Sequence, residues 1–215
     1  MSVVLEIADV VKRYAGRLVL DRATFRFEGP GVLVVRGDNG AGKSTLLSIV
    51  AGALSADAGR VAVCGRDLGA DRVGALRKLG YAPDRMELPL ELTTFELLSL
   101  VAALKGVAPP GDAWIDRIGA RSFLGDRLGA LSLGQRRRAV LLAALTGDPS
   151  LLVLDEPTNG LDLAGLAMLR ALLRERTEQG HSTVLATHDA VFAAEVADAR
   201  VELSEGRLHA TEEHK

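Results

Sequence analysis

The sequence predicts an α/β fold, in which a mainly parallel sheet with helices carries an N-terminal antiparallel β-subdomain and an inserted helical subdomain. Residues 3–8 and 23–28 alternate hydrophobic and more polar side chains, as half-buried strands do. Residues 151–154 are hydrophobic without interruption, which is typical of a parallel strand covered on both faces. From about 84 to 145 the pattern changes to helices and loops. We therefore expect one domain over residues 1–215, with the helical subdomain inside it.

Short strands and one helix are expected before the helical subdomain. Gly29-Pro30-Gly31 is a turn signal, and the apolar, β-branched residues 32–35 after it predict a buried strand. A hydrophobic helix is expected over residues 46–52, and residues 61–64 predict one more short strand.

Capping signals and hydrophobic runs place the remaining elements. Thr93 and Glu96 have the spacing of a capping box and open a hydrophobic helix that runs through Leu104. Further helices are expected over residues 112–120 and 162–178, a buried strand over 183–187, and a final hairpin of 201–203 with 207–209.

The strand at residues 32–35 runs into a phosphate-binding P-loop. Residues 37–44 fit G-x-x-x-x-G-K-[ST] at every fixed position, and a helix follows them. The glycines let the backbone approach a polyphosphate, which the free N–H groups and the positive end of the helix attract. Lys43 is expected to reach the β- and γ-phosphates and Ser44 to ligate Mg²⁺, so the core is predicted to be a P-loop NTPase. The expected nucleotide contacts are Gly37, Asp38, Asn39, Gly40, Ala41, Gly42, Lys43, Ser44 and Thr45.

Two carboxylates follow the hydrophobic run 151–154. Asp155 is expected to hold the Mg²⁺ that also contacts Ser44. Glu156 points to the other side of the strand line, which suits a general base for the attacking water. The structural alternative is an acidic turn after a strand.

Residues Leu131–Gln135 add a second candidate phosphate site. Ser132 and Gln135 have capping-box spacing and predict the start of a helix that runs through Leu145. The same helix start, with a serine hydroxyl and Gly134, could also bind a γ-phosphate, and the capping role and the phosphate contact are compatible. Arg136–Arg138 are expected to form a solvated helix face or to contact lipid headgroups or a partner.

In their order along the chain, these motifs resemble those of the ATP-binding cassette (ABC) ATPase family. The resemblance covers nearly the whole chain and rests on the P-loop, the signature Leu131–Gln135 and the acidic strand end. It extends to a D-loop-like segment at residues 159–162 and to His188, which stands where the family has a phosphate-sensing switch histidine. Tyr14 stands where the family places an aromatic residue against adenine.

The resemblance implies an ATPase with ATP and Mg²⁺ as cofactors. It implies a head-to-tail dimer with an identical or a different ATPase subunit, in which each ATP lies between one P-loop and the signature of the other subunit. The implied nucleotide contacts from that signature are Ser132, Gly134 and Gln135, and the implied catalytic residues are Lys43, Glu156 and His188.

One position departs from the family pattern. Where the family's glutamine loop carries Gln, this chain has Tyr81-Ala82-Pro83-Asp84. Asp84 is shorter and negatively charged, so it is expected either as a further metal ligand beside Ser44 and Asp155 or as a solvated loop residue. The segment is similar to that of some bacterial exporter cassettes, which favours export.

Charge and hydropathy limit the partners. The net charge of −2 gives no basic excess for binding nucleic acid, so no nucleic-acid partner is expected. The N-terminus lacks the features of a signal peptide, and no run of 18 hydrophobic residues occurs. The translocation path must then come from separate integral membrane permease subunits, with this chain peripheral at the cytoplasmic face of the membrane. The helical subdomain, with Asp84 and residues 92–104, is the expected docking surface.

The alternative function is a non-transport ABC ATPase that acts on ribosomes or DNA. Such proteins usually fuse two cassettes with a charged linker or carry long coiled-coil insertions, and this sequence shows neither feature. A regulatory cassette that binds ATP without turnover is disfavoured because the P-loop lysine, both carboxylates and the switch histidine are present.

Overall fold

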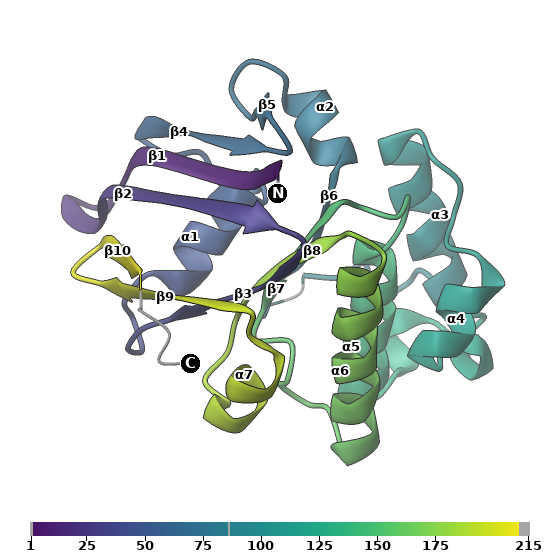
Figure 1. Cartoon of the computed structure of the whole chain (residues 1–215). Helices are drawn as coiled ribbons and strands as arrows, with labels where there is room; N and C mark the ends of the chain where they lie inside the picture. Colours follow the sequence, from purple (N-terminus) through teal and green to yellow (C-terminus); the bar gives the residue numbers. More distant parts are fainter. Residues whose placement is uncertain (1, 86, 211–215) are drawn as a thin grey trace.

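The chain forms two sheets with helices packed around them (Figure 1). The computed structural model describes residues 2–85 and 87–210. A four-stranded antiparallel sheet has the order β2-β1-β4-β5, and a six-stranded sheet has the order β10-β9-β3-β8-β7-β6. The strands are β1 (Ser2–Tyr14), β2 (Arg17–Gly29), β3 (Gly31–Arg36), β4 (Ala58–Val63), β5 (Arg66–Asp67), β6 (Leu79–Ala82), β7 (Leu151–Asp155), β8 (Ser182–Ala186), β9 (Ala199–Ser204) and β10 (Arg207–Ala210).

The helices are divided between the two faces of the six-stranded sheet. Helix α1 lies between the two sheets, while α5, α6 and α7 cover the opposite face (Figure 1). In the larger sheet, β9, β3, β8, β7 and β6 are parallel and β10 is antiparallel to β9. The helices are α1 (Lys43–Val50), α2 (Arg72–Arg77), α3 (Thr94–Lys105), α4 (Asp112–Ile118), α5 (Leu133–Ala144), α6 (Leu163–Glu178) and α7 (Ala190–Val196), with 3₁₀ turns η1 (Arg121–Phe123) and η2 (Leu128–Ala130).

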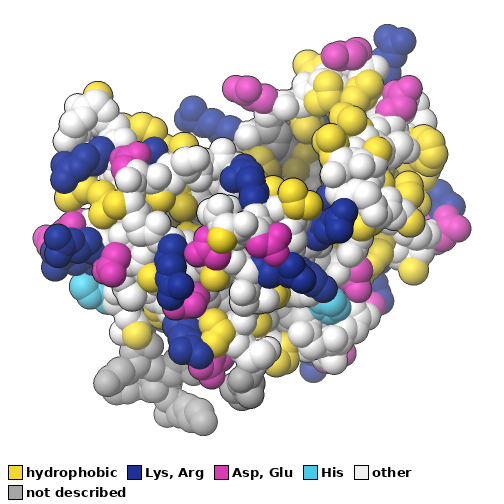
Figure 2. All heavy atoms as spheres, turned by 90° about the horizontal axis from the view of Figure 1, so that it is seen from above, with side chains coloured by type: hydrophobic (Ala, Val, Ile, Leu, Met, Phe, Trp, Pro, Cys, Tyr) yellow, Lys and Arg dark blue, Asp and Glu magenta, His cyan; other side chains and the backbone are white. Residues whose placement is uncertain are grey.

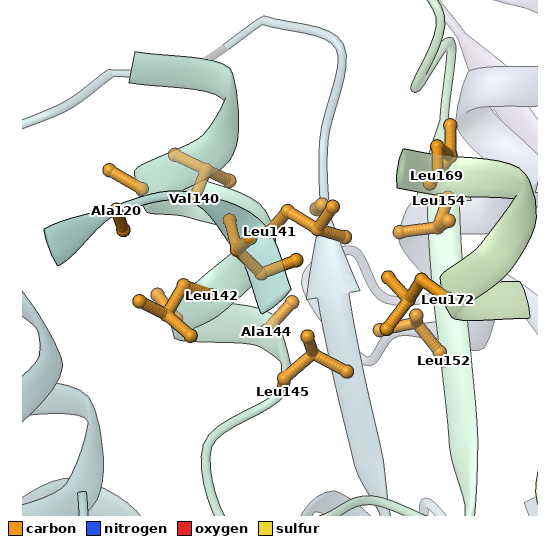
Figure 3. Close-up of a cluster of buried hydrophobic side chains, with 14 of the residues drawn as sticks. Ala120, Val140, Leu141, Leu142, Ala144, Leu145, Leu152, Leu154, Leu169 and Leu172 are labelled. Atoms are coloured by element: carbon orange, nitrogen blue, oxygen red, sulfur yellow. The ribbon is translucent and has the colours of Figure 1, made fainter. Parts of the chain in front are cut away.

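The central strands are buried on both sides, as their uninterrupted hydrophobic runs predict. Leu151 and Val153 face the core around α1, whereas Leu152 and Leu154 face the core around α5 and α6. Figure 3 shows this second core, in which Leu152 and Leu154 of β7 meet side chains of α6, such as Leu169. Two hydrophobic layers therefore hold the sheet and fix the strand ends that carry the polar motifs.

The N-terminal strands are longer than the alternating segments predict. Strands β1 and β2 each span 13 residues, and their pairing shifts register at several points, including between Ile7 and Val10. Asp9 and Arg22 have positive φ angles within these strands. Such bulges insert residues that break the hydrophobic alternation while the pairing continues, so the pattern alone underestimates the strands.

The region between β6 and β7 is helical, as predicted. The capping box at Thr93 is present, because its hydroxyl accepts from the Glu96 amide and the Glu96 carboxylate accepts from the Thr93 amide. Helix α5 packs against β6 as well as against α3 and α4. Short elements such as α2, β6 and α7 were not predicted, since four to seven residues show too little periodicity. Within residues 2–85 and 87–210, no helix is long and hydrophobic enough to cross a membrane.

The contact between β6 and α5 gives a test of the packing. A Cβ atom at Gly80 would overlap the carbonyl oxygen of Ala144 at the end of α5. Gly80→Ala should therefore lower the free energy of unfolding by about 1–3 kcal/mol, the usual cost of overpacking. Equilibrium unfolding in urea measures this, with Gly125→Ala as the control because a Cβ there meets open space. Equal stability of the two variants would contradict the close packing.

Candidate functional site

The P-loop connects β3 to α1 through a backbone that only glycine adopts easily. Gly37 has φ +144°, and a Cβ there would overlap the carbonyl oxygen of Leu203. Gly42 has φ +104° and is the N-cap of α1, where no side chain caps the helix. The first N–H groups of α1 therefore stay available, which is the arrangement that binds a phosphate group.

The Lys43 side chain folds back over this loop. Its Nζ donates to the carbonyl oxygens of Gly37 at 2.7 Å and Asp38 at 2.9 Å. The ammonium therefore lies within the loop, where a polyphosphate held by the backbone N–H groups would meet a positive charge.

Asp155 ends β7 as a buried carboxylate whose hydrogen bonds are incomplete. The residue is only 3% exposed, and its Oδ1 has no hydrogen-bond partner among the described residues. Burial raises the pKa of the Asp155 carboxyl, and the negative charges of Asp84 and Glu156 raise it further. The Ser44 hydroxyl and Lys43 lower the pKa of this carboxyl, so the structure brings both P-loop residues close to it. A buried, unpaired carboxylate oxygen beside a serine hydroxyl suits a hard divalent cation such as Mg²⁺.

Glu156 and His188 meet at the ends of β7 and β8. The Glu156 Oε2 accepts from the His188 amide at 3.1 Å and lies 2.9 Å from the His188 Nδ1. Glu156 has φ +48°, which turns the chain sharply after the strand. The glutamate side chain is mostly buried while the histidine ring is 65% exposed, so the ring can reach a group outside the protein.

The signature segment begins α5 as the capping-box spacing predicts. The Ser132 Oγ accepts from the Gln135 amide at 3.2 Å, and the Gln135 Oε1 accepts from the Ser132 amide at 2.9 Å. Ser132 itself is exposed. No hydrogen bond or ion pair among the described residues joins residues 131–135 to the P-loop, and α5 lies across the sheet from α1 (Figure 1).

Asp84 and Arg137 form an ion pair that the sequence did not reveal. Arg137 Nη2 donates to the Asp84 Oδ1 at 2.9 Å, and the arginine side chain is only 6% exposed. The prediction of a solvated face over Arg136–Arg138 is therefore wrong for Arg137, which is buried between α5 and the segment after β6. Nothing in the local pattern distinguishes it from its two arginine neighbours, and only the tertiary contact shows its role.

Tyr14 lies at the exposed end of β1. Its side chain is 47% exposed, and the Lys12 Nζ lies 5.6 Å from the centroid of its ring. Tyr14 pairs with Arg17, which lines a cavity of about 550 Å³ beside P-loop residues 38–41. The tyrosine thus lies next in the pairing to a residue that lines a cavity beside the P-loop.

Comparison with known proteins identifies the family. A family model described as "ABC transporter" matches residues 20–159, and one described as "AAA domain, putative AbiEii toxin, Type IV TA system" matches residues 127–194. An uncharacterized ABC transporter ATP-binding protein, YhcH of Bacillus subtilis (strain 168), is 33% identical over 87% of this chain, which spans only 63% of that relative's length.

Two further relatives are named for transport in opposite directions. The zinc import ATP-binding protein ZnuC of Paramagnetospirillum magneticum is 36% identical over 86% of this chain and 68% of its own length. The Nod factor export ATP-binding protein I of Burkholderia pseudomallei is 32% identical over 94% of this chain and 68% of its own length. The relatives therefore do not determine a direction of transport.

Solved structures confirm the predicted fold class. A structure of the ATP-binding subunit of an ABC transporter superposes with a TM-score of 0.86 at 26% identity, over 96% of this chain and 90% of that one. An ATP-binding cassette solved as a dimer in a post-hydrolysis state with ADP and Pi superposes with a TM-score of 0.85 at 21% identity, over 98% and 99% of the two chains, and shows the fold alone. With the family model covering residues 20–159, the chain belongs to the family of ABC transporter ATP-binding proteins, which are ATPases.

Proposed function

We propose that this chain binds and hydrolyses ATP to drive transport through separate membrane permease subunits. The observation that carries the proposal is the convergence of three strand ends. The P-loop after β3, the carboxylates at the end of β7 and His188 after β8 lie at the same edge of one parallel sheet. Brought together, they supply a phosphate cradle, a cation site and a hydrogen-bonded glutamate.

Each group then has a distinct task. Lys43 and the N–H groups of the loop bind the β- and γ-phosphates, and Ser44 and Asp155 would hold Mg²⁺, which would supply neutralising charge. Glu156 accepts a proton from the attacking water. Because its Oε2 is engaged by His188, the carboxylate is oriented and its Oε1 is left for that water. Exposed His188 contacts the γ-phosphate, and Tyr14 contacts adenine.

The nucleotide site requires a second ATPase subunit. The signature helix start lies apart from the P-loop of its own chain, so Ser132, Gly134 and Gln135 can reach a γ-phosphate only when two subunits pair head to tail. The signature of each subunit then supplies charge-stabilising groups to the ATP at the other subunit's P-loop.

A hydrophobic groove supports docking of a permease. The groove has a volume of about 440 Å³ and runs between α2, β6, α3 and α5. On the face shown in Figure 2, hydrophobic side chains gather around a hollow. Its lining includes Val73, Leu76, Leu97, Val101 and Leu104, and Arg77 and Lys105 add positive charge. We propose that a short amphipathic helix of the membrane subunit fills this groove.

The segment Tyr81–Asp84 supports export as the direction. It borders the docking groove, since Tyr81 lines it, and resembles the segment of exporter cassettes. The relatives include import and export proteins and favour neither direction.

Glu156→Gln should slow ATP hydrolysis by about 10²- to 10⁴-fold, because the amide cannot accept the proton of the attacking water. It should also accumulate an ATP-bound dimer, whereas Lys43→Ala should lose tight nucleotide binding. Phosphate release and size-exclusion chromatography with ATP measure these effects. Glu178→Gln, at the exposed end of α6, is the matched control. A wild-type rate in Glu156→Gln would show that another group is the base.

Substitutions of Ser132 separate its capping role from its proposed phosphate contact. Ser132→Ala removes the cap of α5 and should lower the free energy of unfolding by about 1 kcal/mol. Ser132→Asp keeps an N-cap acceptor and should restore stability, but its charge repels a γ-phosphate and should abolish ATPase activity. Urea unfolding and phosphate release test the two effects. A fully active Ser132→Asp variant would contradict the phosphate contact.

Docking can be tested by capturing the permease. Tagged Glu156→Gln protein, purified with ATP from gently solubilised native membranes, should bring down a multi-span membrane protein that mass spectrometry identifies. Leu104→Asp in the same background should lose it, because this groove residue is 80% exposed and tolerates a charge without unfolding. Val191→Asp, an exposed apolar position on α7, is the control. Recovery of ribosomes or DNA-bound factors with no membrane protein would overturn the transport function.

A further inference from the structure

Three segments that are distant in the sequence meet at the guanidinium of Arg137. Besides its Nη2 bond to the Asp84 carboxylate, its Nη1 donates to the carbonyl oxygens of Pro83 at 2.9 Å and Asp84 at 3.1 Å. Its Nε donates to the carbonyl oxygen of Asn159 at 3.3 Å. One side chain of α5 therefore binds the segment after β6 and the segment after β7.

The Asn159 side chain closes this arrangement. Its Nδ2 donates to the same Asp84 Oδ1 that accepts from Arg137, at 3.0 Å. Asp84, Arg137 and Asn159 thus contact one another pairwise, and we call them the Arg137 cluster. A guanidinium is a planar fork of five N–H donors, and here it satisfies four acceptors at once, which a lysine could not do.

The Arg137 cluster fixes the start of α5 against the loop that follows Glu156. Asn159 precedes Gly160, which has φ +73° and lies directly under Leu133: a Cβ at Gly160 would be 2.9 Å from the leucine side chain. A Cβ at Gly134 would likewise lie 3.1 Å from the carbonyl oxygen of Gly160. When Arg137 holds Asn159, it therefore also sets where Leu133 and Gly134 sit.

The same contacts bear on the role of Asp84. Its Oδ1 accepts from Arg137 and from Asn159, and its charge faces the buried guanidinium. A carboxylate used in this way is a counter-ion. Without it, the guanidinium would be a buried charge with no partner of opposite sign, which is strongly unfavourable.

We propose that Arg137 is a positioning residue that locks the signature end of α5 to residues 83–84 and 159–160, and that Asp84 serves as its counter-ion instead of a metal ligand. This inference rests on the proposed function in one respect: its effect on catalysis is exerted through the signature contact with ATP. The cluster itself consists of contacts within one chain.

The kinetic test compares substitutions of the two charged residues. Arg137→Gln and Asp84→Ala should each lower kcat about tenfold or more through misplacement of the signature, with the Mg²⁺ concentration for half-maximal rate unchanged. The kcat of the double variant should be about that of the slower single variant, because both substitutions remove the same contact and their effects do not add. Asp84→Asn, which keeps the Oδ1 acceptor but loses the charge, should have a kcat between those of the wild type and Asp84→Ala. Arg138→Gln, on the same helix but paired only at 3.6 Å with Asp162, is the control.

A second readout does not depend on ATP hydrolysis. In the nucleotide-free protein, hydrogen exchange of the amides at residues 133–137 should speed up in Arg137→Gln and Asp84→Ala, speed up less in Asp84→Asn, and stay unchanged in Arg138→Gln. If wild-type protein hydrolysed no ATP, the proposed function would fail while this readout still tested the cluster.

Two results would overturn the inference. If Asp84→Asn and Asp84→Ala both raised the half-maximal Mg²⁺ concentration about tenfold while Arg137→Gln did not, Asp84 would be a metal ligand. If Arg137→Gln left both kcat and hydrogen exchange unchanged, the cluster would position nothing.

Discussion

The parallel register of β3, β8 and β7 is the constraint on which the site depends. Val35 and Asp155 both align with Ala186, so the three strands end at the same level. The next residues along each chain segment then carry the polar groups: the P-loop, Glu156 and His188. Because both faces of this sheet are packed with hydrophobic side chains, a shift of one strand would move buried residues out of register, which fixes the strand ends.

Burying a carboxylate at this edge of the sheet has a cost in folding free energy. The pKa of Asp155 is raised mainly by burial, so its folded value lies above the ordinary 3.8. The ionised carboxylate therefore opposes folding at neutral pH, and this cost disappears only below 3.8, where the group is protonated in both states. A cation between Asp155 and Ser44 would offset the cost, so ligand binding and stability are coupled at this position.

Much of the fold and the candidate site follows from the sequence, because the motifs are local. The P-loop, the capping boxes at Thr93 and Ser132, and the hydrophobic run before Asp155 each depend on neighbouring residues that a pattern can read. The Arg137 cluster could not be read in this way, since its members are more than twenty residues apart and meet only through tertiary packing. The lengths of the bulged strands β1 and β2 were underestimated for a related reason. Inserted residues interrupt the hydrophobic alternation, although the pairing of the strands continues.

The placement of α1 and α5 on opposite faces of the sheet separates the two helix starts that are proposed to bind phosphate. A single polyphosphate cannot lie against both, because the hydrophobic sheet stands between them. In the proposed dimer, each signature contacts the ATP at the partner's P-loop. The orientation of α5 relative to the sheet then determines whether the two nucleotide sites close together. That orientation is held by contacts from the segment after β6, which borders the docking groove, and from the loop after Glu156. The segment that borders the groove and the loop after Glu156 are thus joined through one buried arginine, so a displacement of either segment must move the start of α5 or break that contact.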